Sequence, residues 1–237
     1  MTVKLILGFI LLGSTTSCVR NNPNQIATER SIEKGVERLK NSDILTFISI
    51  NKAKIKDGDL IERSDDDLVS ESLRGLSQTD KTFSHSGIAF LEDSNVYVYN
   101  NMAGEENKSE QMMREPFDSF VSPHRKDGFG IFRYQLSDEE RVKFHDIIKD
   151  LYEKKLLFDK SFDLKTDDKQ YCSEMIYKAL KKATNNRVVL PTTKVQNFKL
   201  RDPKYKGMIL KEFEYVAIDN LFLNPYTTPI VRISYNR

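Results

Sequence analysis

Apolar positions along the chain follow strand spacing in some segments and helix spacing in others. Period-two alternation predicts strands at 84–91 and 95–100, joined as a hairpin by the turn Glu92-Asp93-Ser94. Helical spacing is found at 27–39, after Ser137, and again from Cys172 onward. Further strands are predicted at 59–62 (after the turn Asp57-Gly58), 128–134, 213–218 and 230–235.

The two later helices also have boundary signals. Ser137 and Glu140 have the spacing of a capping box, so we expect a helix to begin at that point. The helix that begins at Cys172 is expected to end near 184–186 and to bury Met175, Ile176, Ala179 and Leu180. Because helices and antiparallel-looking strands occupy separate blocks, the predicted fold class is α+β rather than a parallel α/β sheet.

The N-terminus is typical of an exported protein. Lys4 precedes an apolar run at 5–12 that is too short to span a bilayer, and small polar residues lead to Cys18. Cys18 stands where a bacterial lipobox has its lipidated cysteine, although Thr15 occupies the place usually taken by Leu; ordinary signal cleavage is the alternative. We therefore predict a signal peptide at 1–17, a lipid-anchored tether at 18–27, and one folded domain at 28–237 in the bacterial cell envelope.

Charge and composition exclude some partners. Lys plus Arg number 37 and Asp plus Glu 35, with the signs interleaved, which is not the footprint of a nucleic-acid-binding protein. Asp65-Asp66-Asp67 lacks the alternating ligands and central Gly of a calcium loop, and we expect it to be a solvated loop. His and Cys spacing favours no metal site, and no cofactor is expected.

Cys172 is the main candidate for chemistry. Its only companion in the sequence is Cys18, so it has no partner for a disulfide within the folded domain. At the first turn of a helix, the macrodipole is expected to lower the pKa of the thiol, and unpaired backbone N–H groups can receive an oxyanion. The alternative is that Cys172 is a small buried hydrophobic residue.

Among the three histidines, His85 is the best candidate for a base. It lies on an apolar strand, whereas His124 is in a charged loop and His145 is inside a helix. Alternation places His85 on the face of Gly87 and Ala89, where a helix N-terminus could meet the imidazole. A third group must hold the ring, and Asn100 and Asn101 at the end of the next strand are both available; the alternative is that they are turn residues.

Four motifs in this order resemble those of the permuted papain-like cysteine hydrolases of the NlpC superfamily, in particular their YiiX/YebB-like branch. They are Gly58-Asp59-Leu60-Ile61, Ser84-His85-Ser86-Gly87-Ile88, Tyr97-Val98-Tyr99 and Tyr171-Cys172-Ser173-Glu174-Met175, within residues 50–225. The order, with His before Cys, is the permuted one.

The resemblance implies a circularly permuted papain-like fold, with an antiparallel sheet or small barrel packed against helices. It implies Cys172 as nucleophile, His85 as general base and Asn100 in the third catalytic position, where relatives usually carry Glu. Asp59, Tyr171 and Ser173, which lie in the shared motifs, are expected to bind substrate. Phe158 stands where relatives often carry Tyr.

The leading hypothesis is therefore a membrane-anchored peptidase or amidase that acts by thiol–imidazole acyl transfer on a small peptide, with cell-wall peptides as one substrate class. One alternative is a lipid acyl thioesterase or acyltransferase. Another, motivated by Asn100 and Phe158, is a non-catalytic binding module that keeps the fold.

Overall fold

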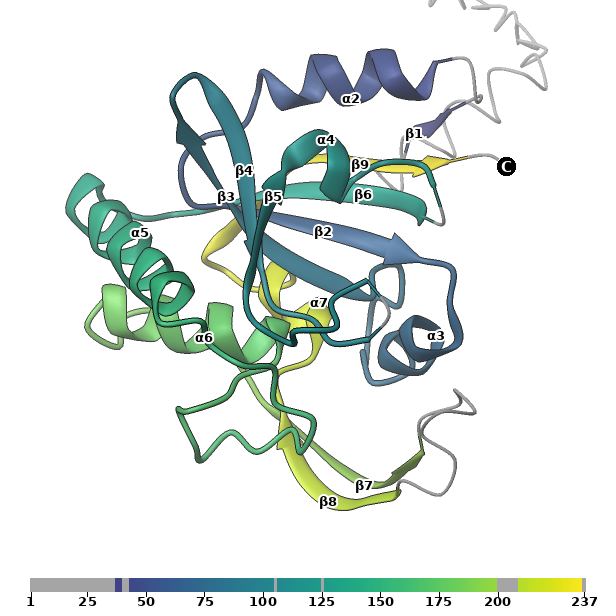
Figure 1. Cartoon of the computed structure of the whole chain (residues 1–237), viewed down its shortest axis with the longest axis vertical. Coiled ribbons are helices and arrows are strands. Elements are labelled where there is room, and N and C mark those ends of the chain that lie inside the picture. Colours follow the sequence, from purple (N-terminus) through teal and green to yellow (C-terminus); the bar gives the residue numbers. More distant parts are fainter. Residues whose placement is uncertain (1–36, 40–42, 105, 125, 200–208, 236–237) are drawn as a thin grey trace, which may run out of the picture. The chain divides into compact units, whose positions relative to one another are not determined.

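An antiparallel sheet is the frame of the fold. The computed structural model describes residues 37–39, 43–104, 106–124, 126–199 and 209–235. Within these residues, seven strands form one sheet in the order β1-β9-β6-β2-β3-β4-β5, in which only β1 and β9 pair in parallel (Figure 1). The strands are β1 Glu37–Leu39, β2 Asp59–Asp65, β3 His85–Glu92, β4 Asn95–Asn100, β5 Met113–Pro116, β6 Lys126–Tyr134 and β9 Thr227–Tyr235; β7 Thr193–Lys199 and β8 Ile209–Tyr215 form a separate pair.

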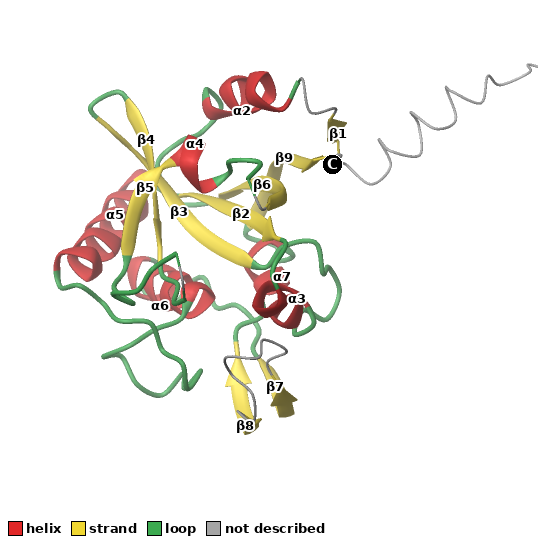
Figure 2. Cartoon of the chain, turned by 45° about the vertical axis from the view of Figure 1, so that its right-hand side comes forward, coloured by secondary structure: helices red, strands yellow, loops and turns green. Residues whose placement is uncertain are grey.

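Helices cover both faces of the seven-stranded sheet (Figure 2). One face packs against α5 (Asp138–Glu153), α6 (Cys172–Ala183) and α7 (Ile218–Phe222). The other packs against α2 (Ile44–Lys52) and α4 (Phe117–Phe120), while α3 (Leu68–Arg74) follows β2. The α+β class and the predicted hairpin of β3 and β4 are confirmed.

Alternation along the central strands assigns side chains to these two layers. Ile88 and Phe90 belong to the cluster of α5 and α6, whereas Ala89 between them belongs to the cluster of α2 and α4. Leu60 and Ile61 are divided in the same way. Because each fully buried aliphatic or aromatic side chain contributes about 1.5–3 kcal/mol, both layers fix the register of β2 and β3.

Gly87 allows β3 and β4 to lie close together at their shared end. A Cβ atom at this position would lie 2.4 Å from Val98 Cγ1 and 3.2 Å from Asn100 Cβ. Asn100 is the cross-strand partner of Gly87 and therefore lies on the same face of the sheet. The glycine thus makes room for Asn100 beside the first residue of β3.

The helix boundary signals are reproduced. At the start of α5, Glu140 N–H donates to Ser137 Oγ (3.2 Å) and Ser137 N–H donates to Glu140 Oε2 (2.9 Å), which is the predicted capping box. The helix α6 begins at Cys172 and ends at Ala183 with Thr184 as its C-cap, as predicted. Within the described residues, none of the helices is both long enough and apolar enough to cross a membrane.

Three local predictions are wrong. Residues 37–39 of the predicted helix 27–39 form β1, because pairing with β9 outweighs the helical pattern; the rest of that segment lies outside the described residues. The strand predicted at 213–218 ends at Tyr215, and Ile218 begins α7. In the predicted solvated loop, Asp65 is buried beside Arg63 and Asp67 caps α3. The predicted signal peptide and the tether with Cys18 also lie outside the described residues.

Candidate active site

The N-terminus of α6 is held in place by the chain that follows β8. Ser173 Oγ donates to the carbonyl of Val216 (2.7 Å), and Val216 N–H donates to the hydroxyl of Tyr171 (3.1 Å). Tyr171 also stacks on Tyr215, with ring centroids 5.0 Å apart. Together these contacts fix Cys172 as the first residue of the helix.

The thiol of Cys172 is surrounded by backbone donors and apolar side chains. The backbone N–H groups of Cys172 and Ser173 face the sulfur from the helix, and that of Ser86 faces it from β3. Burial nevertheless dominates, and together with a smaller contribution from the buried carboxyl of Glu62 it raises the pKa of Cys172 to about 12. The expectation that the helix N-terminus lowers this pKa is therefore wrong for the buried thiol, which is 4% exposed.

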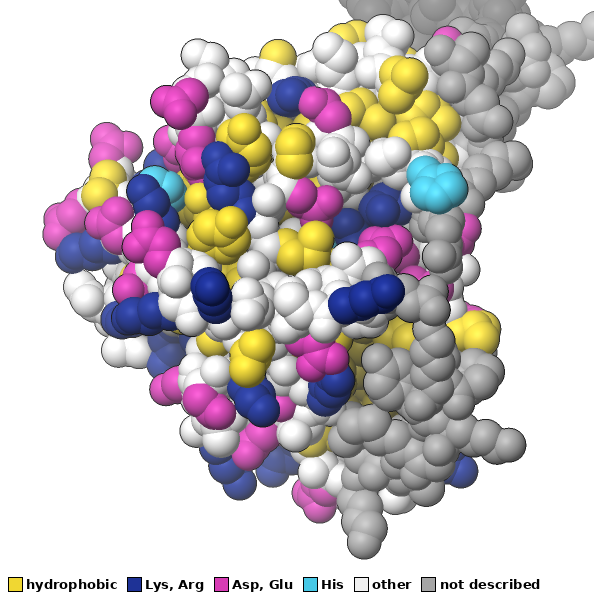
Figure 3. All heavy atoms as spheres, in the orientation of Figure 1, with side chains coloured by type: hydrophobic (Ala, Val, Ile, Leu, Met, Phe, Trp, Pro, Cys, Tyr) yellow, Lys and Arg dark blue, Asp and Glu magenta, His cyan; other side chains and the backbone are white. Residues whose placement is uncertain are grey.

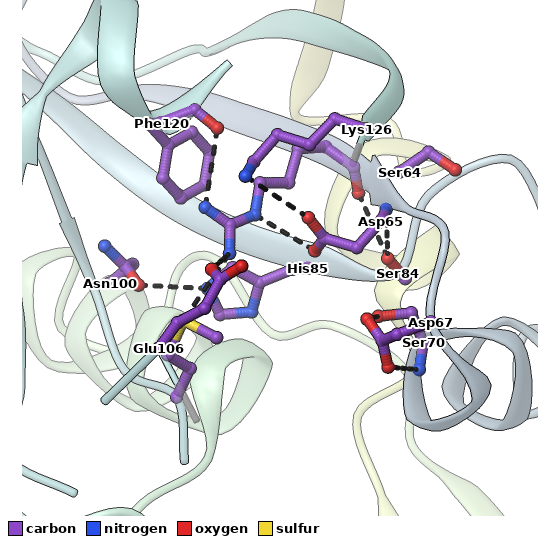
Figure 4. A network of polar contacts seen from close by, with 12 residues as sticks. Ser64, Asp65, Asp67, Ser70, Ser84, His85, Asn100, Glu106, Phe120 and Lys126 are labelled. Carbon is purple, nitrogen blue, oxygen red and sulfur yellow. Dashed lines mark hydrogen bonds and ion pairs between the residues drawn. The ribbon is translucent and has the colours of Figure 1, made fainter. Parts of the chain in front are cut away.

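His85 is held by an asparagine on the neighbouring strand. Its Nε2 lies 3.0 Å from Asn100 Oδ1, and its ring centroid is 5.8 Å from that of Phe120 on α4 (Figure 4). Since α6 packs on the face of Ile88 and Phe90, the expectation that the helix covers the face of Gly87 and Ala89 is wrong. The thiol instead meets β3 at the backbone of Ser86, directly after His85.

Two nearby cations and burial keep His85 neutral. Burial lowers the pKa of its imidazole most, the charges of Arg63 on β2 and Lys126 on β6 lower it further, and the resulting value is about 3. An amide oxygen can only accept, so Nε2 carries the hydrogen and donates to Asn100 Oδ1. Nδ1 then has the free lone pair, which is the atom that can take a proton.

The structure separates the two neighbouring asparagines that the sequence left as alternatives. Asn100 contacts His85, whereas Asn101 points to the opposite face, where its Nδ2 donates to the carbonyls of Gln170 (2.7 Å) and Leu157 (3.2 Å). Gln170 lies two residues before Cys172. Asn101 thus anchors the segment that leads into α6, while Asn100 orients the imidazole.

The three residues expected to bind substrate have structural partners. Asp59 lies at the far end of β2 from Arg63, the cross-strand partner of His85, and its carboxylate accepts from Arg133 Nε (2.8 Å) and Nη2 (2.7 Å). The structure does not bring Asp59 to Cys172. Tyr171 and Ser173 adjoin the thiol, but both side chains contact Val216 and each residue is fully buried.

Three charged residues near the site were not identified from the sequence: Glu62 and Arg63, which are buried, and Glu115, which is partly buried. Glu115 on β5 accepts from Asn100 Nδ2 (2.9 Å), Arg63 lies over the ring of Phe120 at 4.5 Å, and Glu62 accepts from Ser86 Oγ (2.7 Å). Glu62 and Arg63 interrupt an apolar strand, which was the available signal. No sequence pattern identified Glu115, because Met113–Pro116 is too short to show alternation.

Phe158, the second departure from the related sequences, lies in an aromatic cluster rather than at the thiol. Its ring meets that of Phe162 edge to face, with centroids 6.2 Å apart, and Phe162 in turn lies 4.9 Å from Tyr171. The next residue, Asp159, is buried and accepts from the backbone N–H groups of Ser161 and Asp163. Both residues therefore shape the loop before α6.

The described part of the chain holds no group of three or more His, Cys, Asp or Glu side chains arranged to bind a metal ion. Basic and acidic side chains are interleaved over the face shown in Figure 3, as they are along the sequence. Cys172 supplies a thiol on the α6 side of β3, and His85 with Asn100 supplies an imidazole and an amide on the side of Phe120; these are the groups that nucleophilic acyl transfer requires.

Two comparisons with known proteins agree on the family to which this chain is similar. Residues 54–231 match the family model described as permuted papain-like amidase enzyme, YaeF/YiiX, C92 family. A crystal structure described as metalloprotein yiiX from Escherichia coli O157:H7 is 23% identical with a TM-score of 0.59, over 75% of this chain and 97% of that one. At this identity the likeness shows the fold alone. No curated protein sequence matches the chain.

Proposed function

The chain belongs to the permuted papain-like amidases of the YaeF/YiiX type, and we propose that it is an envelope lipoprotein whose Cys172 and His85 hydrolyse amide bonds in small peptides. The family supports cysteine hydrolase activity of the amidase or peptidase kind. Cell-wall peptides are the substrate class that we propose, and the polar N-terminal stretch after Cys18 would connect the domain to its anchor.

In the proposed reaction the imidazole of His85 must reach past β3, because it lies on the face of Gly87 while the thiol meets the backbone of Ser86 on the other face. His85 Nδ1 takes the proton from Sγ of Cys172 as the sulfur attacks the carbonyl carbon of the amide. The backbone N–H of Cys172 donates to the resulting oxyanion. When the intermediate collapses, the leaving amine takes the proton from Nδ1 and a thioester remains. Water then attacks the thioester, a proton returns through Nδ1 to Sγ, and the carboxylic acid is released.

The observation that carries this proposal is the hydrogen bond of 3.0 Å between His85 Nε2 and Asn100 Oδ1. It leaves Nδ1 as the basic atom of a residue whose neighbour, Ser86, faces the thiol through its backbone. In this neutral pair the proton leaves the sulfur only as the sulfur attacks an electrophilic carbon.

Labelling with a thiol-directed electrophile tests the pair. In the full chain with Cys18→Ser, Cys172 is the remaining cysteine, so iodoacetamide incorporation reports on it alone. We expect His85→Ala to slow the labelling by about 100-fold, because general base catalysis contributes at least that factor.

His124→Ala is the matched control, since this histidine is exposed and lies outside the site. It should label at the rate of the parent chain. Equal labelling rates for the His85 and His124 variants would refute the proposed pair.

The substrate class needs its own measurement. Muropeptides and fatty-acyl thioesters are incubated separately with the chain and with its Cys172→Ala variant. Release of new amino groups from muropeptides, lost in the variant, is the expected result. Cleavage of the acyl thioesters alone would assign the chain to lipid acyl chemistry instead, and cleavage of neither substrate would favour a binding module.

A further inference from the structure

Glu115 lies directly behind the amide that holds His85. Asn100 Nδ2 donates to Glu115 Oε1 at 2.9 Å, while Oδ1 of the same amide accepts from His85 Nε2 at 3.0 Å. Val98 is the cross-strand partner of Glu115, so the carboxylate of the edge strand β5 lies on the face of β4 that carries Asn100. The three side chains therefore form a continuous chain of hydrogen bonds.

The carboxylate determines which way the amide points. A side-chain amide has an accepting and a donating end of nearly equal shape, and either end could face a histidine. An ionised carboxylate only accepts, so it draws Nδ2 to itself and leaves Oδ1 for His85. Oδ1 in turn holds the hydrogen on Nε2, and Nδ1 keeps its lone pair.

The positive charges around the imidazole explain why a carboxylate is needed behind Asn100. Arg63 from β2 and Lys126 from β6 both disfavour an imidazolium, and Phe120 from α4 adds only an aromatic face. Asn100 from β4 is neutral. Glu115 from β5, with Oε1 4.0 Å from Arg63 Nη1, is placed to offset that positive charge on the side of the ring that Asn100 occupies.

We propose that Glu115 is a positioning residue of the active site, which fixes the Nε2–H tautomer of His85 through the amide of Asn100. The inference rests on the proposed function of His85 as the base. Glu115 touches neither the thiol nor a substrate; its effect passes through the asparagine.

The proposal is tested in the full chain with Cys18→Ser by removing the carboxylate of Glu115 and then by exchanging it with the amide of Asn100. Glu115→Gln should slow labelling of Cys172 by about 10-fold, by analogy with the loss of an outer hydrogen-bond partner behind a metal-bound histidine. It should also allow the Nδ1–H tautomer, which nitrogen NMR of histidine detects. The double variant Asn100→Asp/Glu115→Gln places a carboxylate next to His85 and an amide behind it, and should restore the Nε2–H tautomer and most of the rate.

Glu106→Gln is the matched control. Its carboxylate lies 3.8 Å from Arg63 Nη2 but has a half-exposed side chain, so this variant removes a negative charge near the same arginine without altering the amide. We expect its tautomer and labelling rate to match those of the parent. A merely structural role for Glu115 predicts no rescue by the double variant.

The outcomes separate this inference from the proposed function. An unchanged tautomer in Glu115→Gln, or a double variant no faster than the single one, would overturn the positioning role while His85→Ala still slows labelling. If His85→Ala has no effect on labelling, the proposed base fails, whatever the tautomer measurements give.

Discussion

Burial, more than the helix dipole, determines the protonation of the reactive residues. Removal from water raises the pKa of Cys172 to about 12 and lowers that of His85 to about 3, so both are neutral near pH 7. A preformed thiolate–imidazolium pair would require both shifts to be reversed. Without substrate, Cys172 is therefore a buried, protonated thiol, a form that is protected from solvent and from oxidation.

Glu62 is a second residue whose charge state follows from burial. It is fully buried on β2, where desolvation raises the pKa of its carboxyl well above 4.5. The groups near it are Ser86 on β3, Cys172 on α6, Tyr134 on β6, Tyr215 on β8, Asp219 on α7 and Asp80 before β3. No cation is among these partners, so the carboxyl remains protonated above its ordinary range.

Glu62→Gln should therefore change how stability depends on pH. When the pKa of a carboxyl is raised in the folded protein, its contribution to stability is fully present at pH values below its pKa in the unfolded chain. Above that pH the carboxyl loses its proton on unfolding, so the stability of the protein falls as pH rises. Above pH 4.5, Glu62 lowers the free energy of unfolding by up to about 1.4 kcal/mol per pH unit, and the Gln variant has no such loss. Urea unfolding should show that the free energy of unfolding of the variant rises relative to that of the parent between about pH 5 and pH 8.

Glu92→Gln is the control with the opposite sign. Burial acts against ionisation of Glu92, but hydrogen bonds from Arg114 and Tyr99 outweigh it and lower the pKa of the carboxyl. Relative to the parent, this variant should lose stability as pH rises toward 4.5 and show a constant difference above that pH. If the Glu62 variant shows the same trend as the Glu92 variant, the buried carboxyl is not protonated.

At the scale of elements, the site depends on how closely β3 and β4 approach. Gly87→Ala would place a methyl group 2.4 Å from Val98 Cγ1, and either the strands separate or Val98 moves. We expect a loss of about 1–3 kcal/mol in the free energy of unfolding, as for other overpacked positions. Labelling of Cys172 should slow as well, because Asn100 moves with the strand.

Removal of the clash tests this explanation. The double variant Gly87→Ala/Val98→Ala should be less destabilised relative to Val98→Ala than Gly87→Ala is relative to the parent, as measured by denaturant unfolding. If the two losses are additive, contact with Val98 is not the cause.

Elements with strong local signals could be predicted from the sequence, and short or packing-dependent ones could not. The capping box and long apolar face identified α5, and alternation identified β3 and β4. By contrast, β1 was predicted as a helix because its pairing with β9 is a long-range contact, and four-residue β5 carries no pattern of its own. The candidate catalytic residues Cys172 and His85 could be identified by motif, whereas Glu115 approaches Asn100 through cross-strand register alone.

At the scale of the whole molecule, β3, β4 and β5 bring His85, Asn100 and Glu115 together, and α6 brings Cys172 to the backbone of Ser86 on β3. His85 precedes Cys172 in the chain, and the segment between them contributes both asparagines, Glu115 and α5. The sheet therefore assembles the site only when β2, β3 and β4 are paired, and formation of the site is expected to be cooperative with folding of the domain.

Membrane attachment is a prediction for the whole chain. If Cys18 carries a lipid, full-length protein expressed in a bacterium should sediment with membranes and incorporate labelled palmitate. Cys18→Ser should abolish both, while Cys172→Ala, which changes the other cysteine, should not. A Cys18 variant that still sediments with membranes and a parent that takes up no palmitate would contradict the lipoprotein assignment.

The adjacent asparagines that end β4 have a consequence for how the family can vary. One faces His85 and the next secures the segment before α6, so a shift of β4 by one residue would exchange the two assignments at once. A one-residue slip in the pairing of β3 with β4 would therefore take the amide away from His85 without replacing any side chain. The pairing register of this hairpin, rather than the length of its turn, is therefore the property that sequence variation has to preserve.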